Sequence, residues 1–349
     1  MSTGYPERTG RSSRRAFLAG AAATLVAGPS MADPSAVVMR RAALPGEDPD
    51  WLAYALSGPY RPDSTVSVVP VGNMEVAMFH SSLAPVSKVV LFSHGAMSTP
   101  TAYAPVLRHL ASHGFLVLAP LHDDNPFRNG LTRLRARPDG TIVWDVSSIL
   151  EDQDAWDRRA RDLVETLDHA DELGASVGLR VDAATPLVMG HEFGAYTAGL
   201  CAGVRARTAD GVLSSKDGRI VGAILMGMFG HGIMGLVEGS FAGLDVPTLV
   251  VQAGLDVDHT GQSPAEKVEA FRAAPAGWKH LAWFPEGKRT LYSARGTGSS
   301  VRERRFEDYV AMLTMFARAY GWRSDAAARR IGSDWPVRAS DRRFAAASR

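Results

Sequence analysis

The chain has 349 residues, 46% of them hydrophobic and 21% charged, and its formal net charge is +1. This is the composition of a globular protein with a large apolar core, and the near-neutral charge argues against nucleic-acid binding. The single cysteine, Cys201, excludes an internal disulfide and a cysteine-based zinc site, and we expect no metal and no cofactor.

The first 32 residues have the pattern of a signal peptide. The pair Arg14-Arg15 precedes an apolar run over 19–28, and small residues follow at Ser30 and Ala32. The run is too short for a membrane helix, and the small residues suit a signal peptidase. The paired arginines resemble a twin-arginine export signal. We therefore expect cleavage after Ala32 and a periplasmic or secreted mature protein with no stable membrane span.

After a lead-in over 33–62, apolar strands alternate with amphipathic helices. Segments 65–71 and 74–79 flank Gly72-Asn73, which predicts a tight hairpin. The elements that follow are strand 88–92, helix 103–113, strand 115–120, helix 158–173, strand 185–189, helix 193–205, strands 220–226, 247–253 and 280–284, and helix 306–320. Strands without a polar face indicate a mostly parallel central sheet with helices on both faces. The alternation has no linker-like break, which predicts one domain over 33–321.

Two segments show no clear periodicity. The loop over 122–156 is long, and long loops in compact domains are often functional lids. The tail over 322–349 is rich in Ala, Arg and Ser, and we expect it to be mobile.

The segment Met-Gly-His-Glu-Phe-Gly-Ala over 189–195 lies between a predicted strand and a predicted helix. This is the context of a nucleophile elbow, in which Gly190 and Gly194 allow the sharp turn and the middle side chain is exposed. The middle residue is Glu192. The pair His191-Glu192 also begins a zinc-protease motif, but that motif needs a second histidine at position 195, where Ala195 stands.

Four segments carry a resemblance to a known family. They read VLFSHG over 90–95, LASHGFLVLAP over 110–120, GHEFGAYTA over 190–198 and SFAGLDVPTLV over 240–250. They resemble the predicted dienelactone hydrolases, relatives of the platelet-activating-factor acetylhydrolases and the cutinase-like polyester hydrolases. The resemblance spans about 55–320. It implies an α/β-hydrolase fold and the hydrolysis of carboxylic esters or lactones by Ser, Asp and His, in that chain order.

The resemblance assigns roles to positions of this chain. The nucleophile position is Glu192, and the acid is Asp256, with Asp258 as a near alternative. The histidine position corresponds to Thr290, or to Arg289 if the register shifts by one. Two of the three catalytic residues therefore differ from the family pattern.

The rest of the predicted site is made of backbone and histidines. The backbone N–H groups of Ala96 and Phe193 are the expected oxyanion-hole donors. His259, three residues after Asp256, is the expected substitute catalytic histidine. His94 and His122 are candidate substrate-binding residues on the same rim. Each of these histidines can also be explained by a local hydrogen bond, and we expect His191 to pack structurally.

Glutamate changes the chemistry at the elbow. A carboxylate needs no deprotonation before it attacks, and relatives with Asp at this position, the haloalkane dehalogenases and epoxide hydrolases, use it as a nucleophile. Those relatives still use a histidine to activate water. We therefore expect that ordinary serine-esterase chemistry does not operate here.

Two hypotheses follow. In the first, an exported hydrolase or lyase uses Glu192 as nucleophile or general base on a small ester, lactone or epoxide. In the second, a catalytically silent relative binds a ligand or protein partner, and Glu192 is paired with Lys288 or Arg289. An Arg or Lys beside the Glu192 carboxylate would favour the second, and a His would favour the first. A third option, an assembly partner exported with another protein, has no specific support.

Overall fold

The computed structural model describes residues 49–124, 134–136, 138–294, 300–333 and 345–348. The predicted signal peptide lies outside these residues. None of the described helices combines the length and the hydropathy that a membrane span requires.

A sheet of nine strands, ordered β1-β2-β4-β3-β7-β10-β11-β12-β13, forms the centre of the described chain. The strands are β1 Ser67–Val71, β2 Met74–Phe79, β3 Ser87–Ser93, β4 Phe115–Pro120, β7 Val181–His191, β10 Gly222–Met226, β11 Thr248–Ala253, β12 Lys279–Phe284 and β13 Ala345–Ser348. The pairs from β4 through β12 are parallel, and β1, β2 and β13 pair antiparallel at the two edges. The predicted hairpin and the mostly parallel sheet are confirmed.

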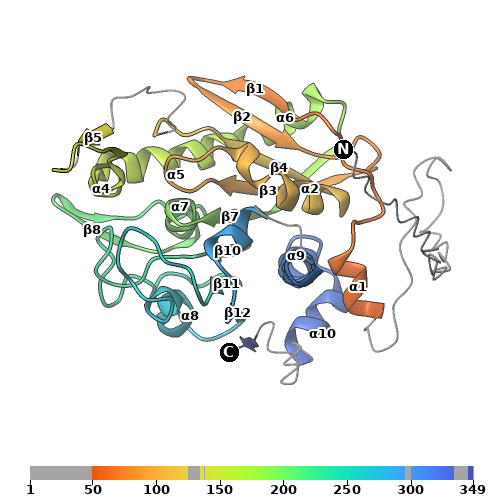
Figure 1. The fold of residues 1–349 in the computed structure, drawn as a ribbon. Coiled ribbons are helices and arrows are strands. Elements are labelled where there is room, and N and C mark those ends of the chain that lie inside the picture. Colours follow the sequence, from red (N-terminus) through yellow and green to blue (C-terminus); the bar gives the residue numbers. More distant parts are fainter. Residues whose placement is uncertain (1–48, 125–133, 137, 295–299, 334–344, 349) are drawn as a thin grey trace, which may run out of the picture.

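Helices cover both faces of this sheet (Figure 1). One face carries α5 (Gln153–Asp168), α6 (Ala170–Ser176), α7 (Phe193–Ala202) and α8 (Glu269–Ala273). The other carries α2 (Ala104–Ser112) and α9 (Ser300–Tyr320), with α1 (Pro49–Ala55) and α10 (Asp325–Ser333) packed on α9. Successive side chains along each strand point to opposite faces of the sheet. In β4, Leu116 and Leu118 join the first core and Val117 joins the second.

The segment over 122–156 contains more structure than the sequence indicated. It includes the hairpin β5 (Leu134–Ala136) with β6 (Ile142–Trp144), the helix α4 (Val146–Glu151) and the first turn of α5. Asp145 caps α4 by accepting from Ser148 N–H, and Asp152 caps α5 by accepting from Ala155 N–H. These caps explain why α5 begins before the predicted start at residue 158.

Structure also occurs where the sequence indicated a mobile tail. In the described part of 322–349, Ala327 and Ile331 of α10 are buried in the second core, and β13 extends the sheet beside β12. The expectation of mobility rested on the Ala-, Arg- and Ser-rich composition, which did not reveal this amphipathic helix. A further hairpin, β8 (Ala206–Thr208) with β9 (Gly211–Leu213), was also not predicted.

Candidate active site

The predicted elbow is present at the junction of β7 and α7. β7 ends at His191, α7 begins at Phe193, and Glu192 between them has φ +51° and ψ −113°. A non-glycine residue in this region is strained by about 1–3 kcal/mol and persists only where its surroundings fix it. The N–H of Glu192 donates to Met226 O of β10 at 2.9 Å, which holds the turn against the neighbouring strand.

The two glycines of the elbow are required by close backbone approach. A Cβ on Gly190 would lie 2.0 Å from Gly194 O, and a Cβ on Gly194 would lie 1.9 Å from Ser93 O at the end of β3. Contacts this short with backbone atoms cannot be relieved by rotating a side chain. The pattern Gly-x-Glu-x-Gly therefore places the Glu192 side chain at the carboxyl edge of the sheet.

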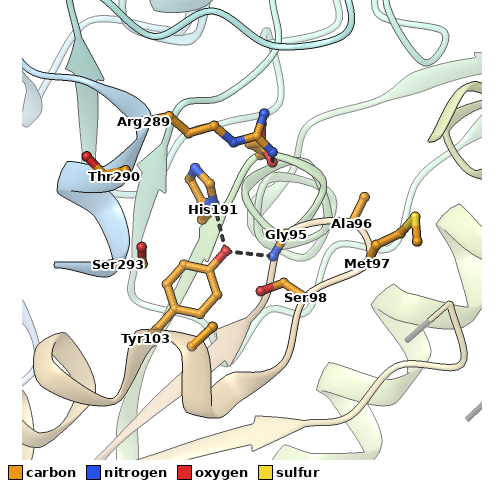
Figure 2. A pocket seen from close by; sticks show the side chains of 11 residues that line it. Gly95, Ala96, Met97, Ser98, Tyr103, His191, Arg289, Thr290 and Ser293 are labelled. Carbon is orange, nitrogen blue, oxygen red and sulfur yellow. Dashed lines mark hydrogen bonds and ion pairs between the residues drawn. The ribbon is translucent and has the colours of Figure 1, made fainter. Parts of the chain in front are cut away.

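Glu192 lines a pocket of about 290 Å³ at this edge (Figure 2). Its walls come from the loop after β3, the turn η2 (Pro100–Tyr103), the elbow and the turn η5 (Arg289–Ser293). The lining residues are Gly95, Ala96, Met97, Ser98, Ala102, Tyr103, His191, Glu192, Arg289, Thr290 and Ser293. The volume is that of a site for a small molecule.

The carboxylate of Glu192 is paired with Arg289. The Nη2 atom of Arg289 donates to Oε2 of Glu192, and the arginine side chain is 37% exposed whereas the glutamate side chain is 5% exposed. Burial raises the pKa of Glu192 to about 7, although the Arg289 charge lowers it in part. Arg289 thus occupies one of the two positions at which the family pattern places histidine. Lys288 and Thr290 are exposed.

Asp256 lies directly after β11, as the resemblance implied, but its partner is a lysine. Its side chain is fully buried, and Oδ2 accepts from Nζ of Lys267 at 3.1 Å. The same Nζ lies 2.5 Å from Oδ2 of Asp258. Asp256 therefore belongs to a buried cluster with Lys267 and Asp258. Lys267 was missed because nothing in the local sequence marks a lysine as buried.

The loop after β3 is held by hydrogen bonds to most of its backbone polar groups. The carbonyl of His94 accepts from Arg159 at 2.7 Å, Gly95 N–H donates to the Tyr103 hydroxyl at 3.2 Å, Ser98 N–H donates to Gly95 O at 3.2 Å, and Met97 N–H donates to Asp124 at 3.4 Å. In the described chain, the Ala96 N–H has no acceptor. A backbone donor left over beside a pocket is available to a ligand.

Phe193 offers a second unpaired donor. It is the first residue of α7, where an N–H group has no partner within the helix, and it directly follows Glu192. No acceptor for this N–H is found among the residues that the structure describes. Within the described residues, neither N–H group predicted as an oxyanion-hole donor has an acceptor; Ala96 lines the pocket, whereas Phe193 is not among the lining residues.

His94 and His122 are fully buried and do not line the pocket. Nδ1 of His122 lies 2.6 Å from Asp162 Oδ2, and its Nε2 lies 2.9 Å from Ser93 Oγ. Burial lowers the pKa of both histidines well below its usual value, so both are neutral at neutral pH. This placement corrects the prediction that they bind substrate, because both are internal supports of the loop.

His259 is exposed and does not line the pocket, so its predicted role as substitute catalytic histidine finds no support in the geometry. The histidine that does line the pocket is His191, which we expected only to pack. Its Nδ1 lies 2.7 Å from the Tyr103 hydroxyl, and its ring centroid lies 4.6 Å from that of Tyr292.

Sequence reasoning missed two further residues of the site. Tyr103 was assigned only to an amphipathic helix, and Arg159 only to the predicted helix over 158–173. Arg159 is 2% exposed, forms a bidentate pair with Asp124 at 2.9 Å, and lies 4.1 Å from the centroid of the Phe193 ring. An arginine within the apolar spacing of a helix is the signal that could have revealed it.

Residues 68–124 match the family model described as Chlorophyllase, a family of the α/β-hydrolase superfamily. The chain has the α/β-hydrolase fold. The match covers the β1–β4 region and ends before the elbow. The matched part of the chain therefore does not include Glu192, Asp256 or Arg289. The search of the curated proteins found no similar sequence. The finer resemblance to dienelactone hydrolases stays a prediction.

Proposed function

We propose that this protein hydrolyses a small carboxylic ester or lactone in the pocket beside Glu192, with Glu192 as the general base that activates water. One juxtaposition carries the proposal. The ionisable carboxylate of Glu192 lines the pocket together with Ala96, and the backbone N–H groups of Ala96 and of Phe193, the residue after Glu192, have no acceptor among the described residues. The matched family, which consists of ester hydrolases, supports the reaction class.

In the proposed reaction, Glu192 removes a proton from a water while the water oxygen attacks the ester carbonyl carbon. The carbonyl oxygen becomes an oxyanion and accepts hydrogen bonds from Ala96 and Phe193. The intermediate then expels the alkoxide, and Glu192 returns the proton to it, leaving acid and alcohol. A group with a pKa of about 7 can take and return a proton near neutral pH, so no histidine is needed.

Attack by Glu192 itself on an ester is the weaker mechanism. It would convert an ester into a mixed anhydride, a higher-energy acyl compound, while releasing a poor alkoxide leaving group. Attack on an epoxide carbon would give an ordinary ester intermediate, but its hydrolysis needs a second base for water. Arg289 cannot serve, because a guanidinium keeps its proton. Esters and lactones are therefore the first substrates to test, and epoxides come next.

The experiment compares the mature chain from residue 33 with Glu192→Gln on panels of small esters, lactones and epoxides. We expect the wild type to turn over at least one ester or lactone, and the glutamine variant to lose about 100-fold or more in kcat because its amide cannot accept a proton. Equal turnover by both proteins would remove Glu192 from the mechanism. An inactive wild type on every panel would reject the proposed reaction.

The Arg289–Glu192 pair favours a second candidate function, a silent relative that binds a small ligand in the same pocket. In this case the Arg289–Glu192 and Asp256–Lys267 pairs would stabilise the fold of the pocket and take no part in catalysis. This candidate predicts that Arg289→Met weakens ligand binding without creating or abolishing turnover. Robust turnover by the wild type would contradict it.

We also propose export through the twin-arginine pathway, on the basis of the first 32 residues. The full-length chain with Arg14→Lys and Arg15→Lys should accumulate in the cytoplasm, because paired arginines are the recognised feature of such signals. Fractionation of cells producing each version tests this. Equal amounts of both proteins outside the cytoplasm would contradict it.

A further inference from the structure

The hydroxyl group of Tyr103 joins the two halves of the candidate site. It accepts from Gly95 N–H at 3.2 Å on the loop side, and it lies 2.7 Å from Nδ1 of His191 on the elbow side (Figure 2). The residue is 3% exposed, and its ring packs edge-on against Phe92 with centroids 4.9 Å apart. Tyr103 nevertheless lines the pocket, so a bound ligand can contact a side chain that Phe92, Gly95 and His191 hold in place.

The hydrogen bonds of the His191 ring determine where the proton of the Tyr103 hydroxyl points. Burial lowers the pKa of His191 well below its usual value, so the neutral imidazole carries one N–H. Its Nε2 is buried and has no partner among the described residues. An N–H at Nε2 would be an orphaned buried donor, which folded proteins avoid more strictly than an unpaired acceptor. The proton therefore belongs on Nδ1, which donates to the Tyr103 oxygen.

With this tautomer, the Tyr103 oxygen accepts two hydrogen bonds, one from Gly95 and one from His191. Its own proton must then be donated elsewhere. Burial and the nearby Glu192 charge raise the pKa of Tyr103 to about 12, so the O–H is intact at neutral pH. The side chain of Ser98, another lining residue, hydrogen-bonds the hydroxyl. Tyr103 and Ser98 both line the pocket, so an oxygen atom of a bound ligand can accept the Tyr103 proton.

We propose that Tyr103 is a substrate-contacting donor, and that its O–H joins the N–H groups of Ala96 and Phe193 in binding the oxygen that becomes negative during hydrolysis. The proposal rests on the proposed function. It also explains Gly95, where a Cβ would come within 3.1 Å of the Tyr103 hydroxyl and 3.2 Å of Glu192 Oε2. A glycine keeps the space between these two polar groups open.

The test is Tyr103→Phe, measured on the best ester or lactone of the panel. Removing one preorganised donor should lower kcat about 100-fold with KM changed less than about threefold, because the donor acts mainly on the developing charge. Tyr196→Phe is the matched control. Its hydroxyl is buried and donates to Met234 O at 2.9 Å, and Tyr196 does not line the pocket. The control should retain its kcat, and both variants should keep cooperative thermal unfolding.

Equal kcat for Tyr103→Phe and the control would overturn the donor role while leaving the proposed function intact. If the wild type turns over nothing, the proposed function fails, and binding of an alkyl phosphonate monoanion then decides the donor role by calorimetry. We expect the wild type to bind this tetrahedral anion at least tenfold more tightly than Tyr103→Phe. Equal affinities, or no binding to the wild type, would overturn the proposal.

Discussion

Arg289 donates through Nη2 to Oε2 of Glu192, so a permanent positive charge lies beside the buried carboxylate. An arginine cannot accept or release a proton in this pH range, whereas a histidine can. In the reaction that we propose, Glu192 therefore carries the proton, and the adjacent Arg289 charge lowers the pKa of Glu192.

Removing the arginine charge should move the pH dependence of the reaction. The Arg289 charge lowers the pKa of Glu192, so Arg289→Met should raise this pKa above about 7. In the proposed reaction the base form of Glu192 is the active one, and the acidic limb of the rate profile should therefore shift to higher pH. Profiles of kcat/KM for wild type and variant test this, with Lys288→Met as a control for loss of a nearby exposed charge. An unmoved limb would show that Arg289 is not coupled to the catalytic base.

The buried carboxylate should also make folding stability depend on pH. Folding raises the pKa of Glu192 from its ordinary value of 4.5 to about 7, so its contribution to stability is fully present below pH 4.5 and is lost as the pH rises through 7. Glu192→Gln has no charge to desolvate. It should be more stable than the wild type at pH 8 by roughly 1–3 kcal/mol, with a smaller difference at pH 5. Urea unfolding at both pH values measures this, and a difference that grows toward low pH would contradict it.

For the buried Arg159–Asp124 pair, removing one charged side chain should destabilise the fold more than removing both. Arg159→Met alone leaves Asp124 buried without its counter-ion and should cost about 3–5 kcal/mol. The double variant Arg159→Met, Asp124→Leu should recover more than half of that loss, because no unpaired charge is left. Chemical unfolding of the wild type, the single variants Arg159→Met and Asp124→Leu, and the double variant gives the coupling free energy. Additive losses in the double variant would mean that the two side chains do not act as a pair.

The elbow glycine should tolerate no side chain. Gly194→Ala places a methyl group 1.9 Å from the backbone oxygen of Ser93, and the strand and helix must separate to accept it. We expect a loss of about 3 kcal/mol or more, together with loss of any turnover. Gly218→Ala is the control, since a Cβ there meets nothing within 4 Å, and it should change stability by less than about 0.5 kcal/mol. Similar stabilities for the two variants would contradict the close approach.

The local pattern of the sequence determined the architecture and the position of the elbow. Continuous apolar strands such as 115–120 and the two glycines around Glu192 encode the parallel sheet and its sharp turn, because period and backbone freedom are properties of neighbouring residues. The same local pattern correctly placed Asp256 after β11, whereas the donor roles of Ala96 and Phe193 stay predictions.

The partners of these groups were decided by the tertiary structure alone. Tyr103 meets His191 across 88 positions of sequence, and Arg289 meets Glu192 across 97. The crossover helices bring distant strand ends to one edge of the sheet. This arrangement decides which cation of the 288–290 turn reaches the Glu192 carboxylate. It also decides that Lys267 is buried against Asp256. Periodicity carries no information about such pairings, because each is a contact between segments whose local patterns are independent.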